Sequence, residues 1–103
     1  MRMTSSVLKV VAALLADPAS ERYGLQIMQA TGLPSGTLYP ILVRLERAGW
    51  VGSRWEDVDP AAEGRPSRRY YRLTAEGVTE ARREVAAMQQ QMARAIGAPG
   101  LST

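Results

Sequence analysis

The residues best suited to bind a ligand form an arginine-rich segment in the second half of the chain. From Arg65 to Arg72 the sequence reads Arg-Pro-Ser-Arg-Arg-Tyr-Tyr-Arg, with four arginines in eight residues and no acid. A guanidinium group pairs well with phosphate, and phosphate contacts supply much of the affinity and the salt dependence of DNA binding. Arg65 lies between Gly64 and Pro66, so we expect it at a loop tip, from which it could enter a narrow minor groove. The DNA-contact candidates in this segment are Arg65, Arg68 and Arg69.

The same segment has a second interpretation. Four acids, Glu56, Asp57, Asp59 and Glu63, come just before it in the sequence. The arginines could therefore form a solvated strand face and pair with these acids instead of with phosphate. From the sequence alone, both interpretations remain open.

A second group of polar side chains is expected on one face of a helix spanning residues 34–48. Leu38, Leu42 and Leu45 recur at helical spacing, and Ile41 widens this apolar stripe. A helix of about 14 residues is roughly 21 Å long, enough to lie in a groove while its apolar side packs on a core. The opposite side carries the remaining DNA-contact candidates: Ser35, Gly36, Thr37, Tyr39, Pro40, Arg44 and Arg47.

The candidates on this helix are expected to make two kinds of DNA contact, with phosphates and with bases. Arg44 and Arg47 lie toward its C-terminal end and favour phosphate anchoring, which leaves base reading to residues 35–40. Tyr39 could equally pack against the core. Pro40 lacks an N–H, so either the helix is capped late, by Thr37, or, with Ser35 as the cap, its first turn is distorted.

Catalysis is disfavoured by the composition. The chain has no His and no Cys, which removes imidazole bases, thiolates and the usual ligands of zinc, copper and iron, so no metal or cofactor is expected. The four loop acids lack a base or nucleophile partner. No stretch approaches the ~20 apolar residues of a membrane span. The apolar run near the N-terminus contains Lys9, unlike a signal peptide, so we expect a cytoplasmic protein.

The candidates need helices and strands to position them. We expect a first helix up to about Ala16, buried on two sides, and a second over residues 21–31 capped by Ser20 with Leu25, Ile27 and Met28 inward. Gly32 then suits a helix end. With the helix at 34–48, these elements predict a helix–turn–helix, although three helices that merely pack together would give the same pattern.

Two strands are predicted after this unit. Residues 50–56 and 68–73 have strand-like composition, with Tyr71 and Leu73 inward and Val51 and Trp55 sharing a face. Residues 57–67 between them form a loop by composition. A long basic hairpin after a helix–turn–helix is a wing. The predicted fold is therefore mainly α (α+β), a winged helix–turn–helix over residues 1–73.

The last predicted helix, residues 74–96, has a narrow apolar seam. Its apolar positions repeat at intervals of three and four, as in a coiled coil, so the seam needs a partner. A second copy of the chain, meeting the wide first helix, would supply one; the alternative is that the helix folds back on its own domain. Residues 97–103 are expected to form a loose tail. The predicted dimer-interface residues are Val7, Val11, Leu14, Val78, Ala81, Val85, Met88 and Met92.

Three segments in this order resemble the PadR family of winged-helix transcriptional regulators, over about residues 5–96. Tyr23-Gly24-Leu25-Gln26-Ile27 is similar to the start of that family's second helix. Gly36-Thr37-Leu38-Tyr39-Pro40, followed by Leu42, Leu45, Glu46 and Gly49, is similar to its recognition helix. Gly64-Arg65-Pro66 with Arg69-Tyr70-Tyr71-Arg72-Leu73-Thr74 and Glu76-Gly77 is similar to its wing and the start of its last helix.

The resemblance implies a homodimeric, ligand-responsive repressor of the compact subgroup that binds an inverted-repeat operator. It points to Thr37, Tyr39 and Arg65 as DNA contacts and to the first and last helices as the dimer contact. The last helix has no aromatic residue, which disfavours a planar aromatic effector. Met88 and Met92 could line an apolar pocket for a small hydrophobic effector between subunits; the alternative is that they only pack in the seam. The alternative function is a winged-helix protein-interaction module without sequence-specific DNA binding.

Overall fold

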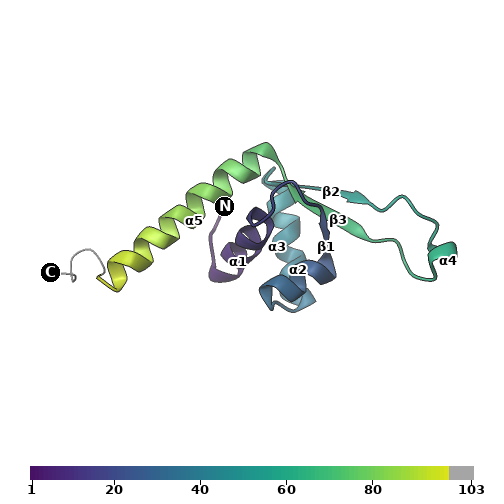
Figure 1. Ribbon diagram of the computed structural model, residues 1–103, viewed down its shortest axis with the longest axis horizontal. Coiled ribbons are helices and arrows are strands. Elements are labelled where there is room, and N and C mark those ends of the chain that lie inside the picture. Colours follow the sequence, from purple (N-terminus) through teal and green to yellow (C-terminus); the bar gives the residue numbers. More distant parts are fainter. Residues whose placement is uncertain (98–103) are drawn as a thin grey trace.

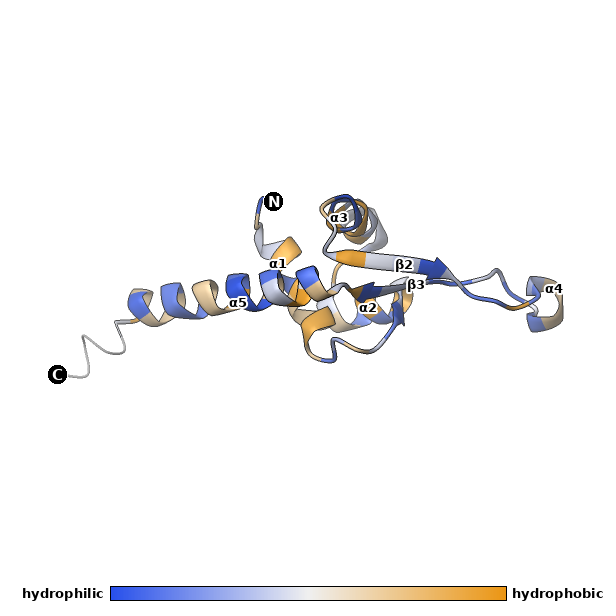
Figure 2. Cartoon of the chain, turned by 90° about the horizontal axis from the view of Figure 1, so that it is seen from above, coloured by the Kyte–Doolittle hydropathy of each residue, from blue (hydrophilic) through white to orange (hydrophobic). Residues whose placement is uncertain are grey.

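The structure, a computed structural model, describes residues 1–97 (Figure 1). Its principal extents are 64 × 25 × 21 Å, so the molecule is elongated. A central body contains three helices and a small sheet. The long C-terminal helix and a β-hairpin extend from this body in opposite directions (Figures 1 and 2).

The first helix, α1 (Ser5–Leu15), is buried on two sides as predicted. Thr4 caps it, since its hydroxyl accepts a hydrogen bond from the Val7 amide at 3.2 Å. Four side chains of α1 are 0–2% exposed within the single chain: Val7, Val10, Val11 and Leu14. They form the centre of the core.

The second helix starts later than predicted. Residues 22–23 form a short strand, β1 (Arg22–Tyr23), and α2 (Gly24–Thr31) follows with Tyr23 as its N-cap, so Ser20 is not the cap. Arg22 pairs with Tyr71, and its guanidinium donates to the Ala13 carbonyl. These contacts with distant segments override local helix preference. Leu25, predicted inward, is exposed as a result; Gly32 ends the helix at a φ of 73°, as expected.

The third helix, α3 (Ser35–Arg47), is capped one residue before the earlier of the two predicted caps, Ser35 and Thr37. Pro34 is the N-cap, and its carbonyl accepts hydrogen bonds from Thr37 and Leu38 at 3.0 Å. Pro40 therefore lies inside the helix, where it cannot donate to the Gly36 carbonyl. The predicted apolar stripe is confirmed: Leu38, Ile41, Leu42 and Leu45 are buried.

The sheet has three antiparallel strands in the order β1–β3–β2. Strands β2 (Val51–Trp55) and β3 (Arg69–Leu73) match the two predicted strands; β1 was not predicted. The pair Val51–Leu73 at one end of the hairpin is buried, whereas the pair Trp55–Arg69 at the other end is not. The hairpin therefore extends beyond the core. We call the connection between β2 and β3, residues 56–68, the wing. The sequence predicted only loop here, but the wing contains a short helix, α4 (Pro60–Glu63).

The last helix, α5 (Ala75–Ala95), begins where predicted. Thr74 caps it, accepting from the Gly77 amide at 2.9 Å. A Cβ on Gly77 would lie 1.9 Å from the Trp50 carbonyl oxygen, so a glycine is needed there. The N-terminal half of α5 covers α1, while its C-terminal half leaves the body (Figure 2). Among residues 1–97, no helix is both long and apolar enough to cross a membrane.

Burial corrects part of the predicted dimer interface. Val7, Val11, Leu14 and Ala81 are 0–2% exposed in the chain's own core, and Val78 packs against the same core. These side chains have little or no surface to offer a second copy. The seam does fold back on its own domain at this end, and only its continuation stays open. The predicted tail lies, apart from Gly97, outside the described residues.

Candidate nucleic-acid interface

The candidates on α3 share one exposed face. Apolar spacing buries one side of the helix and thereby turns the other side to solvent. All seven sequence-predicted residues of this helix are exposed: Ser35, Gly36, Thr37, Tyr39, Pro40, Arg44 and Arg47. The structure therefore brings the α3 candidates together on a rigid surface.

Tyr39 contacts the first residue of α2. A Cβ on Gly24 would lie 1.9 Å from the Tyr39 hydroxyl oxygen, so the ring lies directly against the glycine backbone. The side chain is nevertheless 42% exposed. Tyr39 thus packs α3 onto α2 while part of its side chain remains exposed to solvent.

Arg44 and Arg47 lie in the last turn of α3, where the helix dipole favours positive charge. Within residues 1–97, neither guanidinium is paired with an acid. They line an open cleft of about 470 Å³ together with Arg2. Arg2 was not among the predicted residues, because only the fold brings the N-terminal segment beside the end of α3. This edge of the site is strongly basic.

The wing arginines lie in a different setting. The guanidinium of Arg65 forms a bidentate ion pair with Glu56, with N–O distances of 2.7 and 3.1 Å. Arg65 follows α4 and so is not at the tip, where the sequence had placed it. The interpretation that loop acids pair with the arginines is confirmed for Arg65.

Arg68 and Arg69 are also engaged with protein groups. The guanidinium of Arg68 lies 4.2 Å from the centre of the Tyr23 ring. That of Arg69 lies 5.3 Å from the Trp55 ring, and its Nε donates to the Ser53 hydroxyl at 3.1 Å. Arg69 Nη2 also pairs with the Glu46 carboxylate at 3.5 Å, so an acid as well as a ring fixes this guanidinium.

Strand β2 contributes another arginine near the wing, Arg54, which was not among the predicted DNA-contact residues. Arg54 forms a bidentate ion pair with Glu21, at 2.6 and 2.9 Å, and lies 5.3 Å from the Tyr70 ring. The hydrogen bond from Arg54 lowers the pKa of Glu21. This pair joins the hairpin to the segment before β1. The pairing acid lies more than thirty positions earlier, so only the structure shows it.

A groove separates α3 from the wing. Its volume is about 470 Å³, and Tyr39, Arg68 and Arg69 are among its lining residues. Two apolar side chains, Leu25 and Trp55, also line it; Trp55 is 60% exposed, although it shares a face with buried Val51. Trp55 lies on the predicted face of the hairpin, but at a position beyond the edge of the core, so it is not buried. The site therefore combines cationic, aromatic and apolar groups.

Two of the four acids that precede the arginine-rich segment, Glu56 and Asp59, bind other groups of the protein. Glu56 binds Arg65, and the Asp59 carboxylate caps α4 by accepting from the Ala61 amide at 3.0 Å. In the described part of the chain, no group of three or more acids gathers in a way that could bind a metal ion. The arrangement is suited to recognition of an anionic surface.

Comparisons with known proteins agree with this geometry. The solved structure of smu.1704 from Streptococcus mutans is 26% identical, with a TM-score of 0.74 over 100% of this chain and 97% of that chain. A PadR family transcriptional regulator from Eggerthella lenta is 26% identical, with a TM-score of 0.67 over 92% and 84%. The PcaV transcriptional regulator of Streptomyces coelicolor is 25% identical, with a TM-score of 0.69 over 94% and 62%.

A search of curated proteins found no match. The family model of the PadR-like transcriptional regulators, however, matches residues 11–83, which include the helix–turn–helix, the wing and the start of α5. This agrees with the predicted resemblance and with the winged-helix fold. The chain belongs to the PadR-like family of transcriptional regulators.

Proposed function

We propose that the protein is a homodimeric repressor that binds an inverted-repeat operator through α3 and the wing and is released by an effector. One observation carries the proposal: the exposed face of α3 presents hydroxyls, a tyrosine and two arginines that pair with no acid of residues 1–97, all from a helix anchored in the core. A rigid helix of this length matches the major groove. Family membership supports the regulatory role. Such a regulator acts at the chromosome, in the cytoplasm.

We assign different contacts to the two ends of α3. Ser35, Gly36, Thr37, Tyr39 and Pro40 form its N-terminal part and are proposed to meet base edges. Arg44 and Arg47 are proposed to bind phosphate, with Arg2 beside them in the same cleft. Arg68, directed by the Tyr23 ring, and Arg69, held by the Trp55 ring and by Glu46, are proposed to meet the DNA backbone next to the groove.

The free half of α5 supports the dimer. Met92 and Ile96 are 60% and 69% exposed, and Val85 and Met88 are half-buried on the same seam. An exposed apolar row on a projecting helix is a surface that a second helix can cover. Pairing two copies along it would set the separation of the two α3 helices, which must be about 34 Å for successive major grooves.

A small effector site is proposed near the same helix. A cleft of about 140 Å³ lies between the first residues of the chain and α5, lined in part by Met3, Leu8 and Met88. Ligand sites usually measure about 300–1,000 Å³, so a second copy would have to complete this one. Met3, Leu8, Ala87 and Met88 would give a small hydrophobic molecule its apolar contacts, and Glu84 and Gln91 would give it polar ones.

A protein-interaction module is the competing function. Leu25, Val43 and Trp55 are exposed apolar side chains on or beside the proposed DNA surface, and such groups also suit a protein partner. This alternative predicts that the protein selects no sequence from a random duplex pool.

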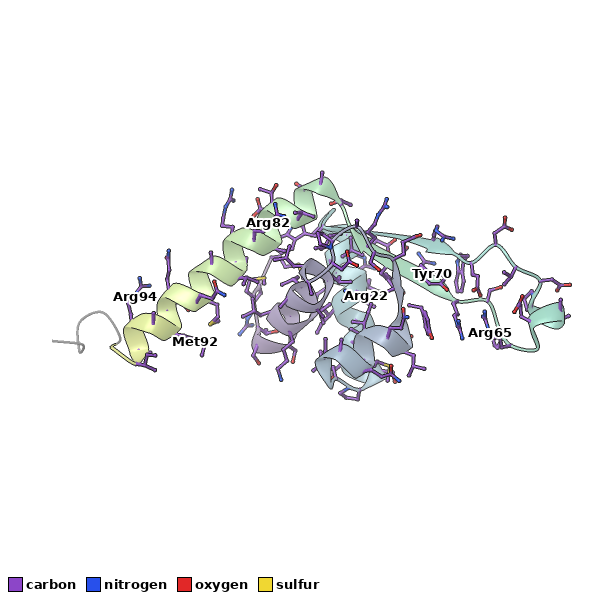
Figure 3. All side chains as sticks on the ribbon, in the orientation of Figure 1. Arg22, Arg65, Tyr70, Arg82, Met92 and Arg94 are labelled. Atoms are coloured by element: carbon purple, nitrogen blue, oxygen red, sulfur yellow. The ribbon has the colours of Figure 1, made fainter. Side chains whose placement is uncertain are left out.

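The decisive experiment selects duplexes from a random pool and measures binding of the selected sequence at several salt concentrations. Arg47→Gln should lower the log–log salt slope by about 0.9 for each phosphate that is no longer neutralised, or about 1.8 per dimer. Arg82→Gln is the matched control, because it removes the same charge from an exposed position on a different helix, α5 (Figure 3). Failure to select any sequence, or equal slopes for both variants, would contradict the proposal.

The dimer has a separate test. Met92→Glu places a charge on the proposed seam at a site that is exposed within the single chain, so the monomer fold should tolerate it. We expect monomers by sedimentation, whereas Gln90→Glu, on the other side of α5, should remain dimeric. A Met92→Glu protein that sediments like the control would show that the seam faces elsewhere.

A further inference from the structure

The wing has no apolar anchor of its own. From Glu56 to Arg68, all of which the structure describes, no residue is buried, and α4 has no buried side chain. Hydrophobic burial, which fixes most elements of a fold, therefore contributes little here. Something else must fix the direction of the wing where it leaves the hairpin.

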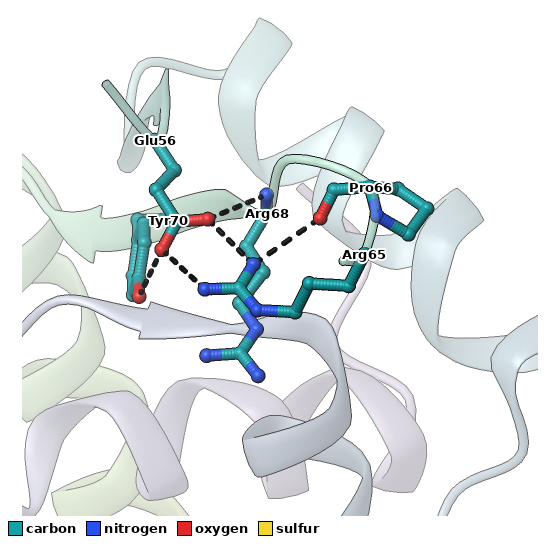
Figure 4. Close-up of polar contacts among 5 residues, drawn as sticks. All are labelled: Glu56, Arg65, Pro66, Arg68 and Tyr70. Atoms are coloured by element: carbon teal, nitrogen blue, oxygen red, sulfur yellow. Dashed lines mark hydrogen bonds and ion pairs between the residues drawn. The ribbon is translucent and has the colours of Figure 1, made fainter. Parts of the chain in front are cut away.

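At the base of the wing, the Glu56 carboxylate follows β2 and contacts residues that lie just before and within β3 (Figure 4). Its Oε1 accepts from Arg65 Nη1 at 2.7 Å and from the Arg68 amide at 3.2 Å. Its Oε2 accepts from Arg65 Nη2 at 3.1 Å and from the Tyr70 hydroxyl at 3.4 Å. The Glu56 amide also donates to the Arg68 carbonyl at 2.7 Å. We call Glu56 with these three residues the Glu56 clamp.

The Glu56 clamp is a strong contact by the criteria that matter for ion pairs. The Arg65–Glu56 pair is bidentate, which adds directionality to charge, and the Glu56 side chain is only 12% exposed. The hydrogen bonds from Arg65 are the largest cause that lowers the pKa of Glu56 to about 2. A carboxylate with so little exposure needs such donors, because losing one leaves it with an uncompensated desolvation cost.

The two end nitrogens of Arg65 are already engaged, because Nη1 and Nη2 donate to Glu56 and Nη1 also donates to the Pro66 carbonyl at 3.2 Å. A phosphate bound through both Nη atoms would have to displace Glu56, leaving that carboxylate with only the weaker donors, the Arg68 amide and the Tyr70 hydroxyl. The charge of Arg65 is in any case balanced by Glu56, so it has little to offer a phosphate. Arg47 has no such constraint, since among residues 1–97 it pairs with no acid. The two arginines, both suited by residue type to phosphate, thus differ in what they can contribute to DNA binding.

We propose that Glu56 is a positioning residue that fixes the wing by clamping Arg65, so that Arg65 supports DNA binding through the wing's geometry and not by neutralising a phosphate. The second part rests on the proposed DNA-binding function; the clamp itself does not. The opposing model makes Arg65 a phosphate contact that Glu56 masks in the free protein. The two models predict opposite effects of removing the Glu56 charge.

The first measurement uses the free protein and needs no DNA. Amide hydrogen exchange of residues 57–68 should become at least about fivefold faster in Glu56→Gln and in Arg65→Gln. Glu63→Gln is the matched control, because it removes an acid from the same wing at an exposed position outside the clamp. Exchange that stays at the wild-type rate in both test variants overturns the clamp, whether or not the protein binds DNA.

The second measurement uses the duplex selected by the wild-type protein. Glu56→Gln and Arg65→Gln should both weaken binding, by about fivefold or more, with salt slopes equal to that of the wild type. Glu63→Gln corrects for the general gain from removing one negative charge. Tighter binding by Glu56→Gln than by Glu63→Gln, or a slope lowered by about 1.8 per dimer in Arg65→Gln, overturns the proposal in favour of the masking model. If the wild type selects no duplex, the proposed function fails while the exchange result still decides the clamp.

Discussion

Helix α3 and the wing are the two parts of the proposed DNA surface, and they are held in place by different forces. Helix α3 is anchored by Leu38, Ile41, Leu42 and Leu45, each at most 2% exposed. The wing, which the structure describes throughout, has no buried residue and is organised by the ion pair of Glu56 with Arg65. One element is fixed by apolar burial and the other by charge.

This difference has physical consequences. Apolar burial is non-directional and largely independent of pH and salt, so the position of α3 should persist as long as the protein is folded. Ion pairs near the surface depend on protonation and on ionic strength. Helix α3 can therefore stay rigid while the wing responds to pH and salt.

The largest effect should come from removing a core side chain of α3. Leu42→Ala should lower the free energy of unfolding by about 2–5 kcal/mol, because a buried leucine loses apolar contacts and leaves a cavity. Chemical denaturation at fixed protein concentration measures it. Val43→Ala, one residue away but exposed, should change stability by no more than about 0.5 kcal/mol. Similar losses in both variants would show that α3 is not anchored by burial.

A smaller effect is expected where α3 meets α2. Gly24→Ala would bring a Cβ into the Tyr39 hydroxyl, so Tyr39 must move; we expect a loss of about 1–3 kcal/mol of stability and weaker DNA binding. Gly36→Ala meets open space within α3 and should instead stabilise the protein by up to about 1 kcal/mol. Calorimetric melting of the two variants tests this. Equal melting temperatures would mean that Tyr39 does not depend on Gly24.

The smallest effect should be the pH response of the wing. Arg65 lowers the pKa of Glu56 from its ordinary value of 4.5 to about 2, so the clamp is fully present above pH 4.5. It is lost as the pH falls toward 2, because protonated Glu56 no longer attracts Arg65. The Arg68 amide, which donates to Glu56, reports this titration by NMR.

The same titration in a variant without Arg65 tests whether Arg65 lowers the pKa of Glu56. In Arg65→Gln the midpoint at the Arg68 amide should move upward, toward 4.5, since the main cause of the lowered pKa is gone. The Leu73 amide, paired within the sheet, serves as a control for overall folding. An unchanged midpoint in the variant would show that Arg65 does not hold the Glu56 charge.

Much of this structure could be read from local patterns. The stripe of Leu38, Leu42 and Leu45 predicted a helix with one exposed face, and Thr74 predicted the start of α5. Both signals are local: side-chain periodicity and capping act within a few residues of each other. The order of the elements, and with it the winged helix–turn–helix fold, was predictable for the same reason.

Contacts between distant segments were not predictable. The short strand β1 exists because Arg22 and Tyr23 pair with β3, almost fifty positions later, and this pairing displaced the expected start of α2. Burial of Val11 and Ala81 in one core removed them from the expected dimer surface. In each case the backbone or a side chain contacts a distant segment, and the neighbouring sequence does not reveal that contact.

The arginines show most clearly the difference between what local sequence predicts and what contacts between distant segments determine. Their type and number can be read from the sequence, and arginine is suited by its guanidinium to phosphate. The fold then determines that Arg47, at the end of a rigid helix, meets no acid of residues 1–97, while Arg65 turns back onto Glu56. The reason is geometric: whether a charge is available depends on which groups the folded chain brings within hydrogen-bonding distance of it.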